Sequence, residues 1–236
     1  MISTLLLLAT LVGLSIPAAL VYIPLTMITG NATPLYNVAQ KIARAALRAA
    51  RIRVTVEGQD KIPAHTACIF MANHVSNLDP PALIPCIPGR TSIFLKRELM
   101  RIPVLGYAFK LGELIPVDRS GSVESAQQSV AAARAAIEHG LHITTFVEGT
   151  RSRDGRMLPF KKGPFYLAMQ TGAPCIPVSI HGTEQMMRKG SMSIRPGTAH
   201  ITFHPPLYPA NYGTREELME AMRASIASGL PEWMRS

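Results

Sequence analysis

Short apolar runs alternate with helical patterns from about residue 53 to the C-terminus. Several runs are almost continuously apolar, as in strands that are buried on both faces. The predicted strands lie at residues 53–57, 67–72, 92–95, 114–118, 142–147, 175–180 and 199–203. The predicted helices lie at residues 80–86, 97–110, 122–139, 163–171 and 214–229. This alternation favours an α/β fold, in which helices cover a mainly parallel mixed sheet on both faces.

The N-terminal segment has a different character, because residues 1–40 contain no Asp, Glu, Lys or Arg. Its apolar run covers the first thirty residues and is long enough to cross a bilayer, which takes about 20 apolar residues. A cleaved signal peptide is an alternative, but no basic residue precedes the apolar run. Pro17 and Pro24 interrupt the run, which permits either a kinked span or a re-entrant helical hairpin in one leaflet.

A basic segment follows the apolar run directly. Lys41, Arg44, Arg48 and Arg51 recur in steps of 3, 4 and 3 residues, so on a helix they share one face. An ordinary solvated helix shows the same pattern. Next to an uncharged segment, we favour contact with anionic lipid headgroups, at about 1 kcal/mol per basic residue. Basic residues beside a span also favour the cytoplasmic side.

The division of the chain follows from these patterns. Residues 1–52 form the predicted membrane segment and basic amphipathic helix, and residues 53–236 form the predicted α/β domain. The net charge of +9 suits nucleic acid, an anionic membrane surface or a phosphorylated substrate. Nucleic acid is the weaker choice, because the sequence shows no aromatic-and-basic RNA motif, finger spacing or basic-region heptads.

Cysteine usage excludes two further classes of site. Cys68, Cys86 and Cys175 are odd in number and far apart, which fits neither a disulfide framework nor a metal site. We expect buried, inert thiols and a reducing compartment.

Candidate chemistry begins with the segment "NHVSNLDP" at residues 73–80, directly after a predicted strand. Asp79 precedes two prolines, which is a good N-cap position for the following helix. Alternatively, the loop folds Asp79 back onto the imidazole of His74. The carboxylate would then fix the tautomer of the ring, and the other ring nitrogen could act as a base. The five-residue spacing alone fits both interpretations.

Two further polar segments also follow predicted strands. Arg119 follows strand 114–118 and can bind phosphate or carboxylate through its fork of donors, although an exposed Arg is an equal alternative. "EGTR" at residues 148–151 follows strand 142–147. Its glycine allows close approach of the backbone to a ligand, and its Thr and Arg supply donors, although a polar turn is the alternative.

Two lysines are further candidates for a phosphate site, and the sequence lacks the common nucleophile and nucleotide-binding motifs. Lys96 follows a predicted strand and Lys162 begins a predicted helix. Each could add positive charge to a phosphate site, although a solvated surface position is commoner for lysine. No G-x-S-x-G, Walker A or G-x-G-x-x-G motif occurs, and no cysteine stands beside His74. The sequence therefore offers a base without a protein nucleophile, and such a base would activate a hydroxyl of the substrate.

Together, these segments resemble the blocks of the glycerolipid acyltransferases, most closely the bacterial 1-acyl-glycerol-3-phosphate acyltransferases. The matching stretches are "NHVSNLD", "ELIPVDR", "FVEGTRS" and "CIPVSI", in this order, within about residues 65–183. One block would be weak evidence, but four in order are highly specific. Val147 stands where the family usually has Pro. We expect a small effect of this departure, and substrate preference is the property that it could change.

The resemblance implies a reaction and roles for these residues. An acyl chain would pass from acyl-CoA or acyl-ACP to the sn-2 hydroxyl of 1-acyl-glycerol-3-phosphate (lysophosphatidic acid), which gives phosphatidic acid for phospholipid synthesis. His74 would be the base and Asp79 its orienting partner. The residues expected to position the glycerol phosphate are Arg119, Glu148, Gly149, Thr150 and Arg151. Glu148 would accept a hydrogen bond from a hydroxyl or from Arg119.

The resemblance also sets the expected cofactors, partners and location. It implies no metal or bound cofactor, because the acyl donor is a co-substrate. The expected partners are lysophosphatidic acid, acyl-CoA or acyl carrier protein, and anionic membrane lipids. The expected location is the inner (cytoplasmic) membrane, with the catalytic domain on the cytoplasmic side. Two alternatives stay open: an acyltransferase for another lyso-lipid, such as a lyso-ornithine lipid or a lysophospholipid, and a non-catalytic lipid-binding homologue.

Overall fold

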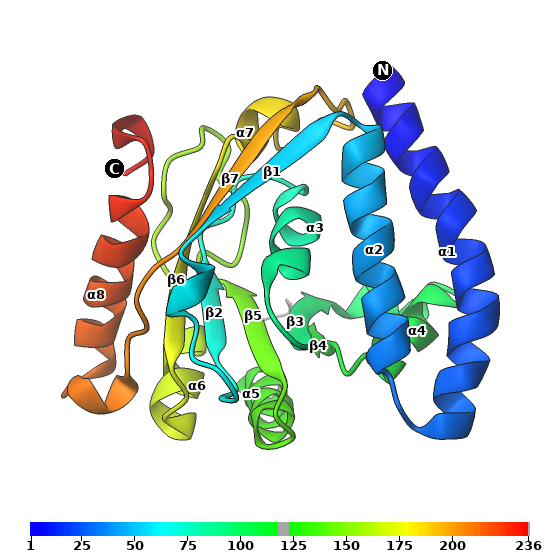
Figure 1. Cartoon of the computed structure of the whole chain (residues 1–236). Helices are drawn as coiled ribbons and strands as arrows, with labels where there is room; N and C mark the ends of the chain where they lie inside the picture. Colours follow the sequence, from blue (N-terminus) through cyan, green and yellow to red (C-terminus); the bar gives the residue numbers. More distant parts are fainter. Residues whose placement is uncertain (118–122, 236) are drawn as a thin grey trace.

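A computed structural model describes residues 1–117 and 123–235, and it shows an α/β domain with a helical hairpin at one side (Figure 1). The strands are β1 (Ile52–Glu57), β2 (Ile69–Ala72), β3 (Thr91–Lys96), β4 (Ile115–Val117), β5 (His142–Phe146), β6 (Cys175–His181) and β7 (Gly197–Phe203). The α-helices are α1 (Ile2–Thr29), α2 (Thr33–Ala49), α3 (Asp79–Leu83), α4 (Leu105–Leu111), α5 (Val123–Glu138), α6 (Lys162–Thr171), α7 (Thr183–Met186) and α8 (Arg215–Ser228). Short 3₁₀ turns include η1 (Gln59–Lys61), η2 (Ile84–Cys86) and η3 (Arg97–Arg101).

The sheet has the strand order β1-β7-β6-β2-β5-β3-β4, and every described pairing is parallel except β6 with β7. This arrangement confirms the predicted mainly parallel mixed sheet. β2 lies in the middle and is buried along its whole length, which explains its unbroken apolar sequence. Ala72 at the end of β2 lies opposite Phe146 at the end of β5. The loops that follow these two strands therefore start side by side.

Two apolar clusters cover the two faces of the sheet. One cluster joins Phe70 to residues of α2 and α3, such as Leu47 and Leu83. The other joins Met71 to residues of α5, α6 and α8, such as Phe165. Because neighbouring strand residues point to opposite faces, β2 contributes side chains to both clusters. This packing fixes the position of the end of β2, where the polar loop with His74 begins.

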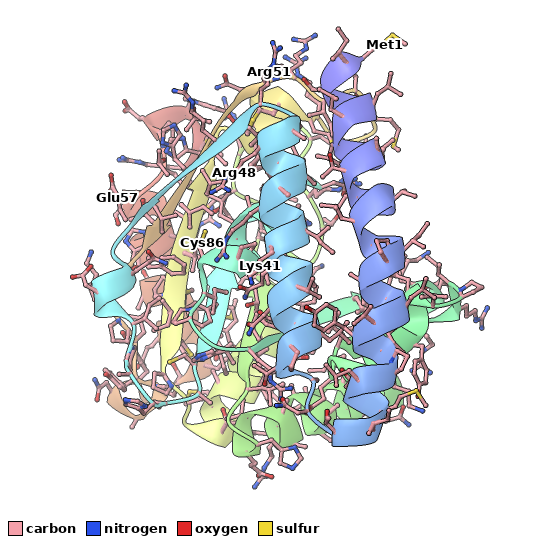
Figure 2. The ribbon with its side chains drawn as sticks, turned by 45° about the vertical axis from the view of Figure 1, so that its right-hand side comes forward. Met1, Lys41, Arg48, Arg51, Glu57 and Cys86 are labelled. Carbon is pink, nitrogen blue, oxygen red and sulfur yellow. The ribbon has the colours of Figure 1, made fainter. Side chains whose placement is uncertain are left out.

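The apolar N-terminal run forms one continuous helix, α1, with Pro17 and Pro24 inside it. The turn of the hairpin lies instead at residues 30–32, where Gly30 has a φ of 67° and ends the helix. The prolines therefore do not form the turn of the hairpin, and the choice between a span and a re-entrant hairpin stays a prediction. α1 is long and apolar enough to cross a membrane by length and composition, and most of its side chains are exposed. It lies at the outside of the molecule, next to α2 (Figures 1 and 2).

The basic segment divides at the end of α2. The helix ends at Ala49, and Arg51 has a φ of 60° in the connection to β1. The prediction that Arg51 shares a helical face with the other three basic residues is therefore wrong. Arg44 also turns towards the domain, where its guanidinium donates a hydrogen bond to the carbonyl oxygen of Pro85.

The segment predicted as one helix over 97–110 is broken in two. Ile102 is extended, with φ of −70° and ψ of 120°, between η3 and α4. Pro103 follows it, and a proline disfavours the helical conformation of the residue before it. Val104 then takes a φ of 65°, which a β-branched residue rarely adopts.

Candidate active site

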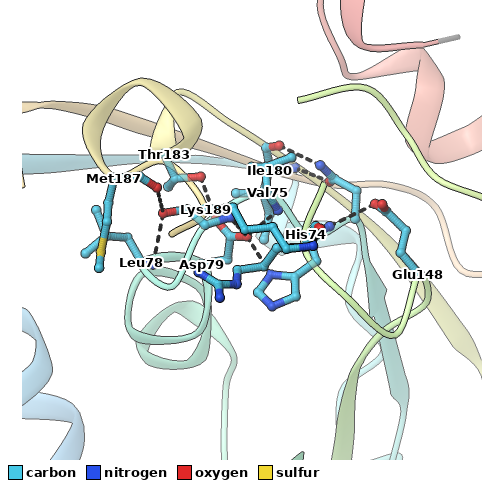
Figure 3. A network of polar contacts seen from close by, with 12 residues as sticks. His74, Val75, Leu78, Asp79, Glu148, Ile180, Thr183, Met187 and Lys189 are labelled. Atoms are coloured by element: carbon cyan, nitrogen blue, oxygen red, sulfur yellow. Dashed lines mark hydrogen bonds and ion pairs between the residues drawn. The ribbon is translucent and has the colours of Figure 1, made fainter. Parts of the chain in front are cut away.

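His74 and Asp79 are in contact at the carboxyl end of β2. The Nδ1 atom of His74 lies 2.8 Å from Oδ2 of Asp79. The same oxygen accepts hydrogen bonds from the backbone N–H groups of Val75 at 2.7 Å and Ser76 at 2.8 Å. The other oxygen accepts one from the hydroxyl of Thr183. Figure 3 shows this network, in which the fully buried carboxylate is surrounded by donors, as an ionised carboxylate requires.

The structure corrects the N-cap prediction for Asp79. The N-cap position is Leu78, and Asp79 is the first residue of α3. The next two residues are Pro80 and Pro81, which have no N–H groups to offer to a capping carboxylate. The carboxylate instead turns back to the loop before the helix, and this turn places it on the imidazole.

The orientation of the imidazole leaves one nitrogen free to act. Since Nδ1 faces a carboxylate that accepts hydrogen bonds, the neutral ring carries its proton there, and Nε2 has the lone pair. The ring stacks on Phe146, with 4.1 Å between centroids and 24° between planes. The His74 side chain is 16% exposed, whereas Asp79 is not exposed. A substrate hydroxyl can therefore reach the ring, while the carboxylate stays shielded from solvent.

The hydroxyl of Ser76, beside the histidine loop, and the three cysteine thiols elsewhere in the fold are not available as nucleophiles. The hydroxyl of Ser76 is buried, donates to the carbonyl of Met187 and accepts from the N–H of Leu78. Burial raises the pKa of the Cys68 and Cys86 thiols to about 11 and that of Cys175 to about 12, so all three are protonated at neutral pH. The arrangement suits general-base catalysis on a substrate hydroxyl rather than a covalent enzyme intermediate.

Asn73 fixes the end of β2 to the neighbouring strand. Its side-chain amide donates to the carbonyl oxygen of Ile180 and accepts from the N–H of the same residue, both at 2.8 Å. Ile180 lies in β6, one strand away. This two-way bond holds the backbone that carries His74.

Glu148, expected to contact the substrate, is buried and bonded to the backbone in this structure. It is 1% exposed, and its two oxygens accept hydrogen bonds from the backbone N–H groups of His74 at 2.9 Å and Leu158 at 3.0 Å. Burial raises the pKa of this carboxyl to about 7, and the nearby charge of Asp79 adds to the increase. Glu148 thus holds the backbone of the histidine, and no described contact joins it to a surface where a substrate hydroxyl would bind.

The loop after Glu148 lies along the same backbone. Gly149 has a φ of 68°, and a Cβ there would lie 3.0 Å from Cγ of Lys161, so the turn requires glycine. The N–H of Ser152 donates to the carbonyl oxygen of His74 at 2.8 Å. Glu148 and Ser152 therefore bind the two sides of the same residue, and Thr150 and Arg151 lie between them.

Lys189, which the sequence analysis did not select, adds positive charge to this loop. Its ammonium donates to the carbonyl oxygen of Arg151 at 2.6 Å and to the hydroxyl of Thr150 at 3.3 Å. A lysine in a polar loop after a strand carries no local signal. Its relevance follows only from the sheet order, which places β6 beside β2.

The remaining predicted phosphate ligands lie elsewhere or outside the described residues. Arg119 falls within residues 118–122, outside the part of the chain that the structure describes. Lys96 ends β3 opposite Val117, two residues before Arg119, and its ammonium lies 3.2 Å from a carboxylate oxygen of Glu98. Lys162 begins α6, with its exposed ammonium 3.9 Å from a carboxylate oxygen of Glu216. Their roles at a phosphate site stay predictions.

Val147 makes contacts that a proline could not make. Its side chain is fully buried, and its N–H donates to the carbonyl oxygen of Ala72 at 3.0 Å. This bond extends the pairing of β5 with β2 by one residue, next to the histidine loop.

Within residues 1–117 and 123–235, no group of three or more His, Cys, Asp or Glu side chains is placed to hold a metal ion.

Thr183→Val is expected to destabilise the fold by about 2 kcal/mol, because it removes a charge-assisted hydrogen bond from Asp79 without changing the side-chain volume. Denaturant unfolding measures the loss. Thr202→Val, at a half-buried position of β7, is the matched control. Equal stabilities for the two variants would contradict a role of Thr183 in holding the carboxylate.

Comparison with known proteins agrees with this geometry. The family model described as Acyltransferase matches residues 53–181. A 1-acyl-sn-glycerol-3-phosphate acyltransferase from Cocos nucifera is 31% identical over 181 residues, which cover 76% of this chain and 58% of that protein. One from Limnanthes douglasii is 35% identical over 158 residues, which cover 66% and 55%. The chain thus spans a little over half the length of these curated relatives.

A solved structure matches over almost the whole chain. It is the crystal structure of the 1-acyl-sn-glycerophosphate (LPA) acyltransferase PlsC from Thermotoga maritima, with a TM-score of 0.81 and 26% sequence identity. The match covers 96% of this chain and 94% of that chain, so it includes the helical hairpin as well as the sheet. The matched family model covers more than half of the chain and includes both His74 and Asp79. The chain therefore belongs to the acyltransferase family.

Proposed function

We propose that the chain transfers an acyl group from a thioester to the free sn-2 hydroxyl of 1-acyl-glycerol-3-phosphate, which gives phosphatidic acid. The observation that carries this proposal is the contact of His74 Nδ1 with Asp79, which leaves Nε2 of a partly exposed ring without a partner in this contact. The relatives from Cocos nucifera and Thermotoga maritima are both named as acyltransferases for this acceptor, which supports the choice.

The proposed reaction needs one base and no protein nucleophile. Nε2 of His74 takes the proton of the acceptor hydroxyl as its oxygen attacks the thioester carbonyl carbon. Asp79 keeps Nδ1 protonated and stabilises the imidazolium that forms. The carbon–sulfur bond then breaks, the new ester forms, and the imidazolium proton goes to the leaving thiolate. The ring returns to its neutral state, so the atoms and charges balance.

The acceptor phosphate would be held by the cations around the histidine loop. Lys189 bridges Thr150 and Arg151, and we propose that it joins Arg151 and Arg119 in this role. Positioning of this kind turns a bimolecular step into an almost unimolecular one, with effects of up to about 7–11 kcal/mol. The donor is acyl-CoA or acyl carrier protein, used as a co-substrate.

We also propose a location at the inner membrane, with the domain on its cytoplasmic side. The exposed apolar surface of α1 supports association with a membrane, and the basic residues that follow it favour the cytoplasmic side. Phosphatidic acid and its precursor both partition into bilayers, so an enzyme held at the interface meets them there. An acceptor other than lysophosphatidic acid, such as a lyso-ornithine lipid or a lysophospholipid, would use the same base.

A panel of acceptors and donors tests the proposal. Release of free thiol is measured with acyl-CoA or acyl carrier protein and with each lyso-lipid, for the wild type, His74→Ala and the control His139→Ala, which changes an exposed histidine. The base contributes about 10²–10⁴-fold, so His74→Ala should lose that factor and His139→Ala should not. Turnover of another lyso-lipid but not of lysophosphatidic acid would refute the proposal that lysophosphatidic acid is the acceptor. Equal rates for the wild type and His74→Ala would refute the role of His74 as the base.

A further inference from the structure

A second polar hollow lies far from His74, between α2 and the loop before β3. It has a volume of about 530 Å³. Its lining includes the side chains of Asn37, Gln40, Arg44, Gln59 and Arg90. A smaller hollow of about 330 Å³ adjoins it, since both share Thr33 and Asn37, and this one is lined by Lys41 and by Tyr22 of α1. We call the two together the α2 groove.

The α2 groove is rich in donors and cations. Among the described residues that line the two hollows there is no Asp or Glu. Arg44 and Gln59 donate to the carbonyl oxygens of Pro85 and Cys86, so these oxygens, which would repel an anion, are already bonded. One guanidinium nitrogen of Arg90 lies 3.2 Å from a carboxylate oxygen of Glu113, and within the described part of the chain its other N–H groups have no hydrogen-bond acceptor.

The location separates the α2 groove from the candidate active site. Residues 85–90 precede β3, at the amino ends of the parallel strands, whereas His74 follows the carboxyl end of β2. The two sites therefore lie at opposite ends of the parallel strands. Figure 2 shows Cys86 beside α2, with Lys41 close by and Arg48 nearer the C-terminal end of the helix.

The groove also adjoins the apolar surface of the hairpin. Tyr22 belongs to α1, and its neighbours Leu20, Val21 and Leu25 are exposed. A molecule with its anionic head in the groove could lay an apolar chain along this part of α1. Two guanidinium groups, one ammonium group and several amides suit a phosphate ester better than a carboxylate, because phosphate accepts more hydrogen bonds.

We infer that the α2 groove binds the phosphate headgroup of an anionic glycerophospholipid, at a site separate from the catalytic one. The inference does not depend on the proposed transfer reaction. It treats Arg44 and Arg90 as ligands of the phosphate and Lys41 as the cation of the smaller hollow.

Lipid binding to the full-length chain in detergent tests the inference. Native mass spectrometry follows the binding of phosphatidylglycerol, phosphatidylcholine and oleate to the wild type, Arg44→Lys and Arg48→Lys. Both substitutions keep the charge and remove the guanidinium fork on the same helix, but only Arg44 lines the groove. We expect about tenfold weaker phosphatidylglycerol binding in Arg44→Lys, the effect of one charge-assisted hydrogen bond, and no change in Arg48→Lys. Hydrogen exchange should show protection of residues 33–44 and 85–90.

Several results would overturn the inference. One is an equal effect of the two lysine substitutions, which would indicate non-specific charge attraction. Others are equal binding of oleate, and displacement of phosphatidylglycerol by inorganic phosphate at matched concentration, which would exclude a lipid site. If Arg44→Lys unfolds, Lys41→Gln and its control Arg48→Gln replace the pair. Equal binding by these two variants would again contradict a site.

Discussion

Asp79→Asn is expected to lower kcat/KM for acyl transfer by about three orders of magnitude, while the chain stays folded. The carboxylate contributes a negative charge 2.8 Å from Nδ1 of His74, and this charge stabilises the imidazolium that forms as the acceptor hydroxyl loses its proton. An amide has the same shape but no charge. The expected loss is therefore in the rate of the chemical step.

The surroundings of Asp79 allow this test to separate charge from folding. An asparagine oxygen can take the place of Oδ2 and accept from Val75 and Ser76, while its amide nitrogen donates to the hydroxyl of Thr183. The expected cost in stability is roughly 1–3 kcal/mol, because neutral hydrogen bonds are weaker than charged ones. Asp79→Ala instead leaves several buried donors without an acceptor, and its cost should be at least twice as large.

Steady-state kinetics and denaturant unfolding of the two Asp79 variants are compared with those of Asp60→Asn, which makes the same change at an exposed position in η1. A folded Asp79→Asn chain that kept more than about one tenth of the wild-type kcat/KM would show that the charge is not needed.

The sequence predicted the strands better than the loops, for a physical reason. A strand that is buried on both faces must be apolar throughout, so runs such as the one at residues 67–72 are visible without knowledge of their neighbours. The break near Pro103 was also readable in principle, because proline restricts the residue before it. The position of Arg51 depends on where α2 ends, and no glycine or proline marks that end.

The candidate site was predictable only in part. The spacing of His74 and Asp79 permitted a contact, but the same residues permitted a helix cap. The contact depends on Thr183, which is 104 residues from Asp79 along the chain and comes close because β6 pairs with β2. The sequence marked Glu148 as polar and next to a strand end, which describes a substrate ligand and a buried support equally well. Its 1% exposure favours the buried support, and burial is a property of the whole fold.

Glu148→Gln is expected to remove a pH dependence of stability between about pH 7 and the ordinary pKa of a glutamate. Burial raises the pKa of Glu148 to about 7 in the folded chain. Between the two pKa values the folded chain holds a proton that the unfolded chain releases, so stability rises as the pH falls from about 7 towards 4.5. The full change is on the order of 3 kcal/mol. A glutamine does not titrate, so this slope should disappear from the unfolding free energy.

The same substitution should also slow the reaction, through the backbone of His74. A glutamine presents one acceptor oxygen where the carboxylate presents two, so the N–H of either His74 or Leu158 loses its partner. A displacement of the histidine by about 1 Å can cost up to 10²-fold in rate, and we expect kcat to fall by about ten- to a hundredfold. Glu57→Gln, at an exposed position in β1, is the control for both measurements. If Glu148→Gln kept the wild-type pH slope, the slope would not arise from the titration of Glu148, and if it kept the wild-type kcat, Glu148 would not position His74.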